Sequence, residues 1–413
     1  MVARAGLLAL APGPDPMRRS GPIKARPLAL ALLGAALRAP AAGAQAAVPV
    51  APAPVAPAPV APAPVAPAPV APAAAGSVAA DPTAAAVDRE LARLGFNGSV
   101  LVARGDSVLY RRHLGFADLE AGAPVGPETR FELASLAKPL TALVVLQLVE
   151  RGKLRLDGRV ADYLPEFTRP DARAVTVHHL LSHTSGLQDF VGLTCAFAGW
   201  TNAEFLAGLA TTPLQFPPGA RFQYASSTYV LLRLLVERVT GRPFEALLHE
   251  QVFDPAGMRH SGVVHTGRLL RGRARGYVRT DSGYRHAAPI ANSAIFLGAA
   301  SVYSTAEDLR RLDRALYGEA LLSAASKARM FRAVRPPYGY GWFVSDSPER
   351  GAVVSHGGDI FGFTTLIERR LRDRALLVVL SNVQDADREA VVGVLERALS
   401  RPAAEPASRR RPR

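Results

Sequence analysis

Ser135 and Lys138 lie three residues apart in the segment Phe131 to Pro139, FELASLAKP. A serine hydroxyl is a weak nucleophile until a base removes its proton, and a lysine amine is such a base only when uncharged. Residues three apart on a helix share one face, so this spacing brings the hydroxyl and the amine within reach. The pair predicts nucleophilic attack by Ser135 with Lys138 as its general base.

The residues that follow this pair predict a buried helix that begins near Ser135. A mostly apolar stretch runs to Val149, and Pro139 is tolerated only in the first turn of a helix. The free N–H groups at that helix end, together with burial, disfavour the ammonium form of Lys138. The alternative is a serine cap beside a surface lysine. A surface helix would show a polar stripe, which this segment lacks.

Two later segments contain further candidate residues. Residues 217–226 read PPGARFQYAS and precede a helix predicted from Thr228 to Thr240, which Gly241 ends. Residues 355–363 read SHGGDIFGF, where adjacent glycines allow a substrate to approach the backbone closely. The alternative for the second segment is a glycine-rich turn between strands.

These motifs resemble those of the β-lactamase-related serine hydrolases, in the branch of class C β-lactamases, penicillin-binding proteins and family VIII esterases. The S-x-x-K spacing belongs to that family. Residues 177–187, VHHLLSHTSGL, resemble the branch's H-L-L-x-H-T-S-G-L signature. The resemblance covers about residues 84–400 and implies an acyl-transfer enzyme that needs no cofactor.

The resemblance also implies roles for residues outside the Ser135–Lys138 pair. Tyr224 would share the proton transfer with Lys138 if flanking cations lower the pKa of its phenol; the alternative is a core tyrosine. Ser226 stands where the family usually has asparagine and would contact the substrate or, alternatively, cap the following helix. The backbone N–H groups of Ser135 and Asp359 would form the oxyanion hole.

The segment His356-Gly357-Gly358 resembles a variant of the family's Lys-Thr-Gly motif and is expected to bind substrate. A histidine is only partly charged near neutral pH, whereas lysine is a fixed cation suited to a substrate carboxylate. This favours small esters, amides or peptides over efficient penicillin hydrolysis. The expected activity is therefore that of an esterase or D-amino-acid peptidase, with weak β-lactamase activity as a further option.

Two alternative functions remain open at this stage. The first is a non-catalytic protein of the same fold that binds penicillin or cell-wall peptide. The second is a metallohydrolase that uses His179 and His183, which have the i, i+4 spacing of a zinc helix. No glutamate follows His179, so the H-E-x-x-H pattern fails and we expect no metal site.

Composition narrows the class of protein. The chain has 413 residues, 49% of them apolar, and a formal charge of +14. Only four of its 49 basic residues are lysines, and no nucleic-acid-binding motif accompanies the charge, so we expect no nucleic-acid partner. Cys195 is the one cysteine, which excludes an intrachain disulfide and a cysteine-based metal site. We interpret it as a packing residue.

The order of predicted elements favours an α+β fold. Strand pairs are predicted at residues 99–104 and 107–115 near the start, and at 362–368 and 374–381 near the end, followed by a helix at 387–400. The middle of the chain is rich in helix. We therefore expect one antiparallel sheet, flanked by helices and built from both chain ends, with an all-helical region inserted.

The sequence of the N-terminal residues predicts that the protein is exported. Residues 1–46 resemble a signal peptide, with basic residues, an apolar run at 27–37 and an A-x-A site at 44–46; Met17 is an alternative start. Residues 47–82 form a linker rich in Pro, Ala and Val, 83–400 the hydrolase domain, and 401–413 a disordered basic tail. The apolar run is about half as long as a membrane span, so the mature chain should have none. We expect a periplasmic or extracellular protein, or one tethered by an uncleaved signal anchor.

Overall fold

The computed structural model describes residues 82–167, 170–189, 200–288 and 293–399. The predicted signal peptide, the linker as far as residue 81, the basic tail and Cys195 lie outside the described residues. Within the described residues, none of the helices combines the length and the apolar character that a membrane span requires.

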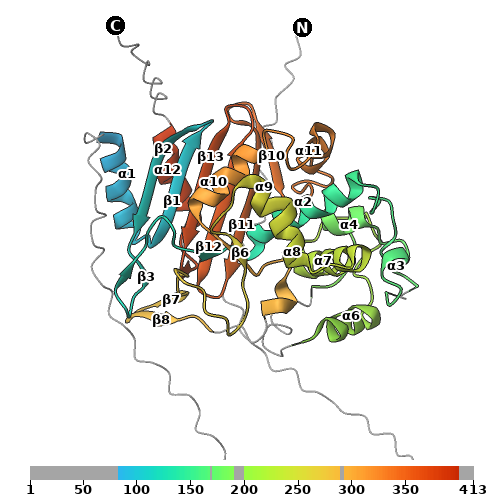
Figure 1. The fold of residues 1–413 in the computed structure, drawn as a ribbon. Helices are drawn as coiled ribbons and strands as arrows, with labels where there is room; N and C mark the ends of the chain where they lie inside the picture. Colours follow the sequence, from blue (N-terminus) through green and yellow to red (C-terminus); the bar gives the residue numbers. More distant parts are fainter. Residues whose placement is uncertain (1–81, 168–169, 190–199, 289–292, 400–413) are drawn as a thin grey trace, which may run out of the picture. The chain divides into compact units, whose positions relative to one another are not determined.

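A six-stranded antiparallel sheet forms the centre of the fold (Figure 1), in the order β10-β11-β12-β13-β1-β2. These strands are β1 (Gly98–Arg104), β2 (Ser107–Leu114), β10 (Phe343–Ser347), β11 (Gly351–Ile360), β12 (Phe363–Arg370) and β13 (Ala375–Ser381). β1 pairs with β13 along its whole length, which joins the two ends of the domain in one sheet. β13 is buried at every residue, because helices cover both sheet faces.

Helices α1 (Pro82–Arg93) and α12 (Arg388–Leu399) contact each other and cover one face of the sheet. Apolar residues recur at helical spacing in both helices, and Val87, Leu91 and Leu395 enter a core shared with strands β1, β2 and β13. The helix that was predicted to follow residue 386 is thus confirmed.

The other face of the sheet packs against α10 (Ala306–Ala315) and the larger core. Helices of the middle region lie beside it (Figure 1): α2 (Ala137–Glu150), α3 (Val160–Tyr163), α4 (Val177–Leu181), α6 (Asn202–Thr211), α7 (Ser226–Thr240), α8 (Phe244–Leu248), α9 (Asp254–Ala256) and α11 (Ala324–Met330). The π-helical turn η2 (His249–Phe253) joins α8 to α9. The predicted α+β architecture with an inserted helical region is confirmed.

Short strands complete the fold in three small sheets. They are β3 (Phe116–Asp118) with β4 (Ala123–Pro124), β5 (Phe131–Glu132) and β6 (Gly262–Val263) on either side of β9 (Val302–Ser304), and β14 (Val383–Gln384) and β8 (Gly283–His286) on either side of β7 (Tyr277–Thr280). Two 3-10 turns are η1 (Ala134–Leu136) and η3 (Ser293–Phe296).

Helix α2 confirms the predicted buried helix. Every residue from Ala137 to Leu148 is buried. A helix that is apolar on all sides belongs in the interior, which explains the missing polar stripe. The α-helix begins at Ala137, and Ser135 lies in the preceding turn η1, so the nucleophile candidate stands immediately before the helix.

Candidate active site

The structure brings Ser135 and Lys138 into direct contact. The Lys138 amine, Nζ, lies 2.9 Å from Ser135 Oγ, 3.3 Å from Ser226 Oγ and 3.2 Å from the carbonyl oxygen of Ala299. The Ala299 carbonyl can only accept, so it takes one N–H of the amine. A neutral amine has one N–H left for Ser226 and a lone pair for the Ser135 hydroxyl proton. The geometry fits a general base.

Burial also favours the neutral form of Lys138. The side chain is fully buried, and desolvation lowers the pKa of its amine to about 7, although the negative charge of Asp189 opposes this. A lysine with a pKa near 7 is neutral in about half of the molecules at pH 7, and the neutral amine can accept a proton. Ser135 itself is only half-buried, so a substrate can reach it.

The backbone before the nucleophile has an uncommon conformation. Ala134 has φ +52°, a left-handed conformation that costs a residue with a side chain about 1–2 kcal/mol. This turn leads the chain from β5, where Glu132 pairs with Tyr303 of β9, directly into α2. The strained residue thus stands immediately before Ser135, as local strain often does at functional sites.

Tyr224 lies beside this pair, but its protonation differs from the expectation. The Lys138 amine lies 4.8 Å from the centre of the Tyr224 ring. Burial raises the pKa of the phenol above its usual value, the negative charges of Asp189 and Asp359 add to the rise, and a hydrogen bond with Ser135 opposes it. The condition that flanking cations lower this pKa is therefore not met. Tyr224 is a protonated phenol that can donate a hydrogen bond.

Ser226 is the first residue of α7, and its side chain does not cap that helix. The carboxylate of Asp189 takes that role: it accepts hydrogen bonds from the backbone N–H groups of Ser226, at 2.9 Å, and Ser227, at 3.1 Å, and from Ser227 Oγ, at 3.0 Å. The interpretation of Ser226 as a helix cap is therefore wrong. Its hydroxyl is directed to Lys138 instead.

His183 holds the loop that contains Tyr224. Its ring lies 4.4 Å from that of Tyr224, and Nδ1 accepts a hydrogen bond from the backbone N–H of Ala225, at 3.3 Å. Nδ1 also lies 3.1 Å from Thr228 Oγ1, whose hydroxyl donates to the Ala225 carbonyl oxygen at 2.8 Å. The carbonyl oxygen of His183 accepts from the N–H of Gln223, at 2.9 Å. Burial keeps the pKa of the ring well below its usual value. His183 is therefore a neutral anchor for the Tyr224 loop.

His356 is buried on β11, and both of its ring nitrogens have partners. Nδ1 lies 2.6 Å from the carbonyl oxygen of Gly357, and Nε2 lies 3.0 Å from the Tyr338 hydroxyl. Nδ1 must carry the proton, since the carbonyl can only accept, and Tyr338 then donates to Nε2. Burial lowers the pKa of His356 to about 3. The expected partial charge is thus absent, and the ring is neutral.

The glycines of β11 allow this strand to lie against the turn that contains Ser135. A Cβ added to Gly358 would lie 2.1 Å from the carbonyl oxygen of Leu133 and 3.0 Å from the Cβ of Ala134. A Cβ on Gly357 would lie 2.9 Å from an Arg388 guanidinium nitrogen. β10 pairs with β11 only from Gly351 to Ser355, so the described structure leaves residues 356–360 unpaired on that edge. Ser135, Gly358 and Asp359 are therefore neighbours, and their substrate and oxyanion roles stay predictions.

The pair His179 and His183 does not form a metal site in the described residues. His179 Nδ1 accepts from the Thr176 backbone N–H, at 3.2 Å, whereas His183 Nδ1 is bonded to Ala225 and Thr228. The described part of the chain contains no group of three His, Cys, Asp or Glu side chains arranged to hold a metal ion.

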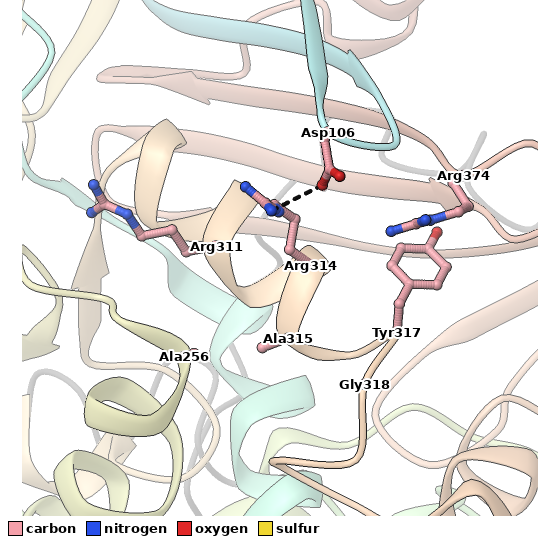
Figure 2. A pocket seen from close by; sticks show the side chains of 8 residues that line it. All are labelled: Asp106, Ala256, Arg311, Arg314, Ala315, Tyr317, Gly318 and Arg374. Carbon is pink, nitrogen blue, oxygen red and sulfur yellow. Dashed lines mark ion pairs between the residues drawn. The ribbon is translucent and has the colours of Figure 1, made fainter.

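One cavity is lined in part by residues that are close in sequence to the candidate site residues. A second cavity is lined by other parts of the domain. The first, of about 420 Å³, is lined by residues that include Glu132, three before Ser135, and Phe361, two after Asp359. The second, of about 660 Å³, lies at the C-terminal end of α10 (Figure 2). There Arg314 forms a 2.9 Å ion pair with Asp106, and Arg374 stacks on Tyr317. Ser135 and Lys138 do not line either cavity.

The sequence model of the family described as Beta-lactamase matches residues 83–399. The chain belongs to the Beta-lactamase family. It is 35% identical over 316 residues to a penicillin-binding protein of Bacillus subtilis (strain 168), which covers 70% of this chain and 69% of that protein. It is 34% identical over 348 residues to Esterase EstB of Burkholderia gladioli, covering 71% of this chain and 88% of the esterase.

The fold comparison agrees with this assignment. The solved structure of a penicillin binding protein from Bacillus halodurans matches with a TM-score of 0.65 and 28% identity, over 75% of this chain and 98% of that one. The resemblance proposed from the motifs is thus confirmed, and so is the prediction of a serine hydrolase. The family model's match, residues 83–399, covers the described domain almost completely.

Sequence reasoning missed two residues of this Beta-lactamase family site. Asp189 was not predicted as a site residue, because a carboxylate that caps a helix 37 residues later leaves no local pattern. Tyr338, which donates to His356, was not considered. The N-cap position of α7 is occupied by Ala225, whose side chain cannot accept a hydrogen bond. The sequence thus indicated that a residue from elsewhere in the chain must cap this helix.

Proposed function

We propose that this chain hydrolyses small carboxylic esters through an acyl-enzyme formed on Ser135. The observation that supports this proposal most strongly is the contact between the buried Lys138 amine and Ser135 Oγ at 2.9 Å. The identity to Esterase EstB supports an ester as the substrate. Amides and peptides use the same chemistry and are further substrates of the proposed site.

The proposed reaction has two halves. Lys138 takes the hydroxyl proton while Ser135 Oγ attacks the carbonyl carbon, and the N–H groups of Ser135 and Asp359 bind the oxygen that becomes negative. The lysine proton then passes to the departing alkoxide, which leaves as an alcohol, and Tyr224 donates a hydrogen bond nearby. In the second half, water attacks the acyl carbon and loses a proton to Lys138. The bond to Ser135 Oγ then breaks, Lys138 returns the proton to that oxygen, and the acid is released.

The buried, neutral His356 argues for neutral substrates. Lysine at this place of the family's motif offers a fixed cation to a substrate carboxylate, and His356 offers none while its pKa is about 3. Of the nearby cations, Arg388 is already bonded to the Asp359 carboxylate at 3.1 Å and to the carbonyl oxygen of Thr365. We therefore expect weak turnover of penicillins, whose carboxylate would lack a partner.

The experiment is a turnover assay with nitrophenyl acylates on the domain that begins at residue 82. Ser135→Ala should lower kcat at least 1,000-fold, and Lys138→Arg nearly as much, because arginine stays protonated. Ser345→Ala and Lys153→Arg are matched controls at exposed positions and should leave kcat unchanged. Full activity of Ser135→Ala would refute the proposal.

A second candidate function is a non-catalytic protein that binds β-lactams or cell-wall peptide, which the identity to a penicillin-binding protein favours. A fluorescent penicillin distinguishes the two. Stable labelling of Ser135 without turnover of any ester in the panel would favour the binding protein. Ester turnover with a short-lived acyl-enzyme would favour the hydrolase.

We further propose that the chain is exported, on the basis of the signal-peptide pattern of residues 1–46, in which Met17 is an alternative start. Fractionation of cells that express the full chain tests this. The protein should be found outside the cytoplasm, with a mature N-terminus after residue 46 or with the leader retained as an anchor. Recovery of the intact chain only in the cytoplasm would contradict export.

A further inference from the structure

The carboxylate of Asp189 is the cap of helix α7. It accepts hydrogen bonds from the N–H groups of Ser226 and Ser227 and from the Ser227 hydroxyl, at 2.9, 3.1 and 3.0 Å. These N–H groups begin the helix and have no intrahelical acceptor, and the helix dipole favours an anion at this end. The N-cap residue, Ala225, has no side chain that could replace the carboxylate.

This cap is connected to the general base by a short series of bonds. Asp189 binds the backbone of Ser226, Ser226 Oγ lies 3.3 Å from Lys138 Nζ, and Nζ lies 2.9 Å from Ser135 Oγ. Ser226 has a short side chain, so its hydroxyl reaches Lys138 only while the first turn of α7 is held close to the base. Asp189 supplies that restraint.

Asp189 also contributes charge at this place. Among the described groups that act on Lys138, it is the anion that stabilises the ammonium form and opposes the desolvation. His183 and His356, which face Lys138 from α4's end and β11, are both kept neutral by burial. The phenols of Tyr224 and Tyr229 stay protonated, since burial raises the pKa of each, and the Asp359 carboxylate is bonded to Arg388.

We propose that Asp189 is a positioning residue for acyl transfer, which fixes the first turn of α7 so that Ser226 stays on Lys138 and which places a negative charge beside that base. This inference rests on the proposed function of Ser135 and Lys138. It adds that the loop after α4 controls both the geometry and the working pH of the base.

Three variants test this inference through the pH profile of kcat/KM with a nitrophenyl acylate. Asp189→Asn keeps a side-chain oxygen for the cap but removes the charge, so the acid limb should move to lower pH by about 0.5 unit. Asp189→Ala removes the cap as well, and kcat should fall about 10-fold. Glu204→Gln is the matched control: Glu204 accepts from the N–H of Thr201 at the start of α6, at 2.7 Å, and its loss should leave the profile unchanged.

Active enzyme is counted by titration with a fluorophosphonate, so that partial unfolding of a variant does not lower the measured kcat. An acid limb that stays in place in Asp189→Asn, or an unchanged kcat in Asp189→Ala, would overturn the inference. If Ser135→Ala is inactive while both Asp189 variants behave as the parent, only the role of Asp189 fails. If Ser135→Ala is active, the proposed function itself fails.

Discussion

The Lys138 amine lies 2.9 Å from the Ser135 hydroxyl oxygen, and the lysine side chain is completely buried. Most lysines lie at the surface, where water keeps them charged. Here burial in the first turn of α2 lowers the pKa of the amine to about 7. The contact and the lowered pKa are the two features that the proposed role of Lys138 as a base for the neighbouring hydroxyl requires.

The first prediction concerns the pH dependence of ester hydrolysis. Lys138 must lose its proton to act, so kcat/KM should rise with pH and level off above a pKa of about 7. Below that pKa, the rate should fall about tenfold for each pH unit, because the fraction of neutral amine falls in proportion. Initial rates between pH 5 and 9 measure this, and a rate independent of pH across that range would contradict the assignment.

The second prediction concerns the close approach of β11 to the turn of Ser135. Gly358→Ala places a Cβ 2.1 Å from the carbonyl oxygen of Leu133, so strand and turn must separate, and kcat should fall at least 10-fold. Gly393→Ala is the matched control, because nothing lies within 4 Å of the new Cβ on helix α12. The control should be stabilised by about 0.5–1 kcal/mol through better helix propensity. Equal activity of the two variants would contradict the packing.

The third prediction concerns His183 as an anchor of the Tyr224 loop. His183→Phe keeps an aromatic ring but leaves the Ala225 N–H without its acceptor, so about 1–2 kcal/mol of unfolding free energy should be lost. Ester turnover should fall with it, since Tyr224 loses its support. His249→Phe, whose ring contacts Phe253, is the control, and urea unfolding measures both. A wild-type midpoint for His183→Phe would be inconsistent with anchoring.

The fourth prediction concerns the ion pair between Arg369 and Asp313, whose charged atoms lie 2.6 Å apart and are almost completely buried. Asp313→Ala leaves the guanidinium without its partner and should cost about 3–5 kcal/mol. Replacing both residues, as Asp313→Leu with Arg369→Met, should cost much less because no buried charge remains. Thermal unfolding measures the loss of unfolding free energy in Asp313→Ala and in the double variant. Equal losses in the two would contradict this prediction.

Local patterns predicted the parts of this site that depend on local structure. The spacing of Ser135 and Lys138 and the apolar run behind them were sufficient to predict the contact between the two side chains and the buried helix. The strand pairs predicted at residues 99–104 and 107–115, and at 362–368 and 374–381, were enough to predict a sheet made from both chain ends. Tyr224 required the family resemblance, because one tyrosine before a helix is not distinctive.

The remaining features depend on contacts between distant segments. Whether His356 is charged depends on its burial and on Tyr338, 18 residues away, and the sequence contains no sign of either. The pKa of Tyr224 rises because of desolvation and two carboxylates from separate segments, Asp189 in the loop after α4 and Asp359 on β11. The cap supplied by Asp189 to α7 is likewise a tertiary contact. Charge states in this site are thus properties of the fold.

The most direct test of the central claim is the mass of the acyl-enzyme. The purified domain is mixed with a slowly hydrolysed nitrophenyl ester at pH 8, quenched in acid during turnover, digested and analysed by mass spectrometry. The acyl mass should be found on the peptide that contains Ser135, and it should be absent from Ser135→Ala and strongly reduced in Lys138→Arg. Turnover with the acyl group on a residue other than Ser135 would contradict the account. So would a Ser135→Ala variant that is active and yields no acylated peptide.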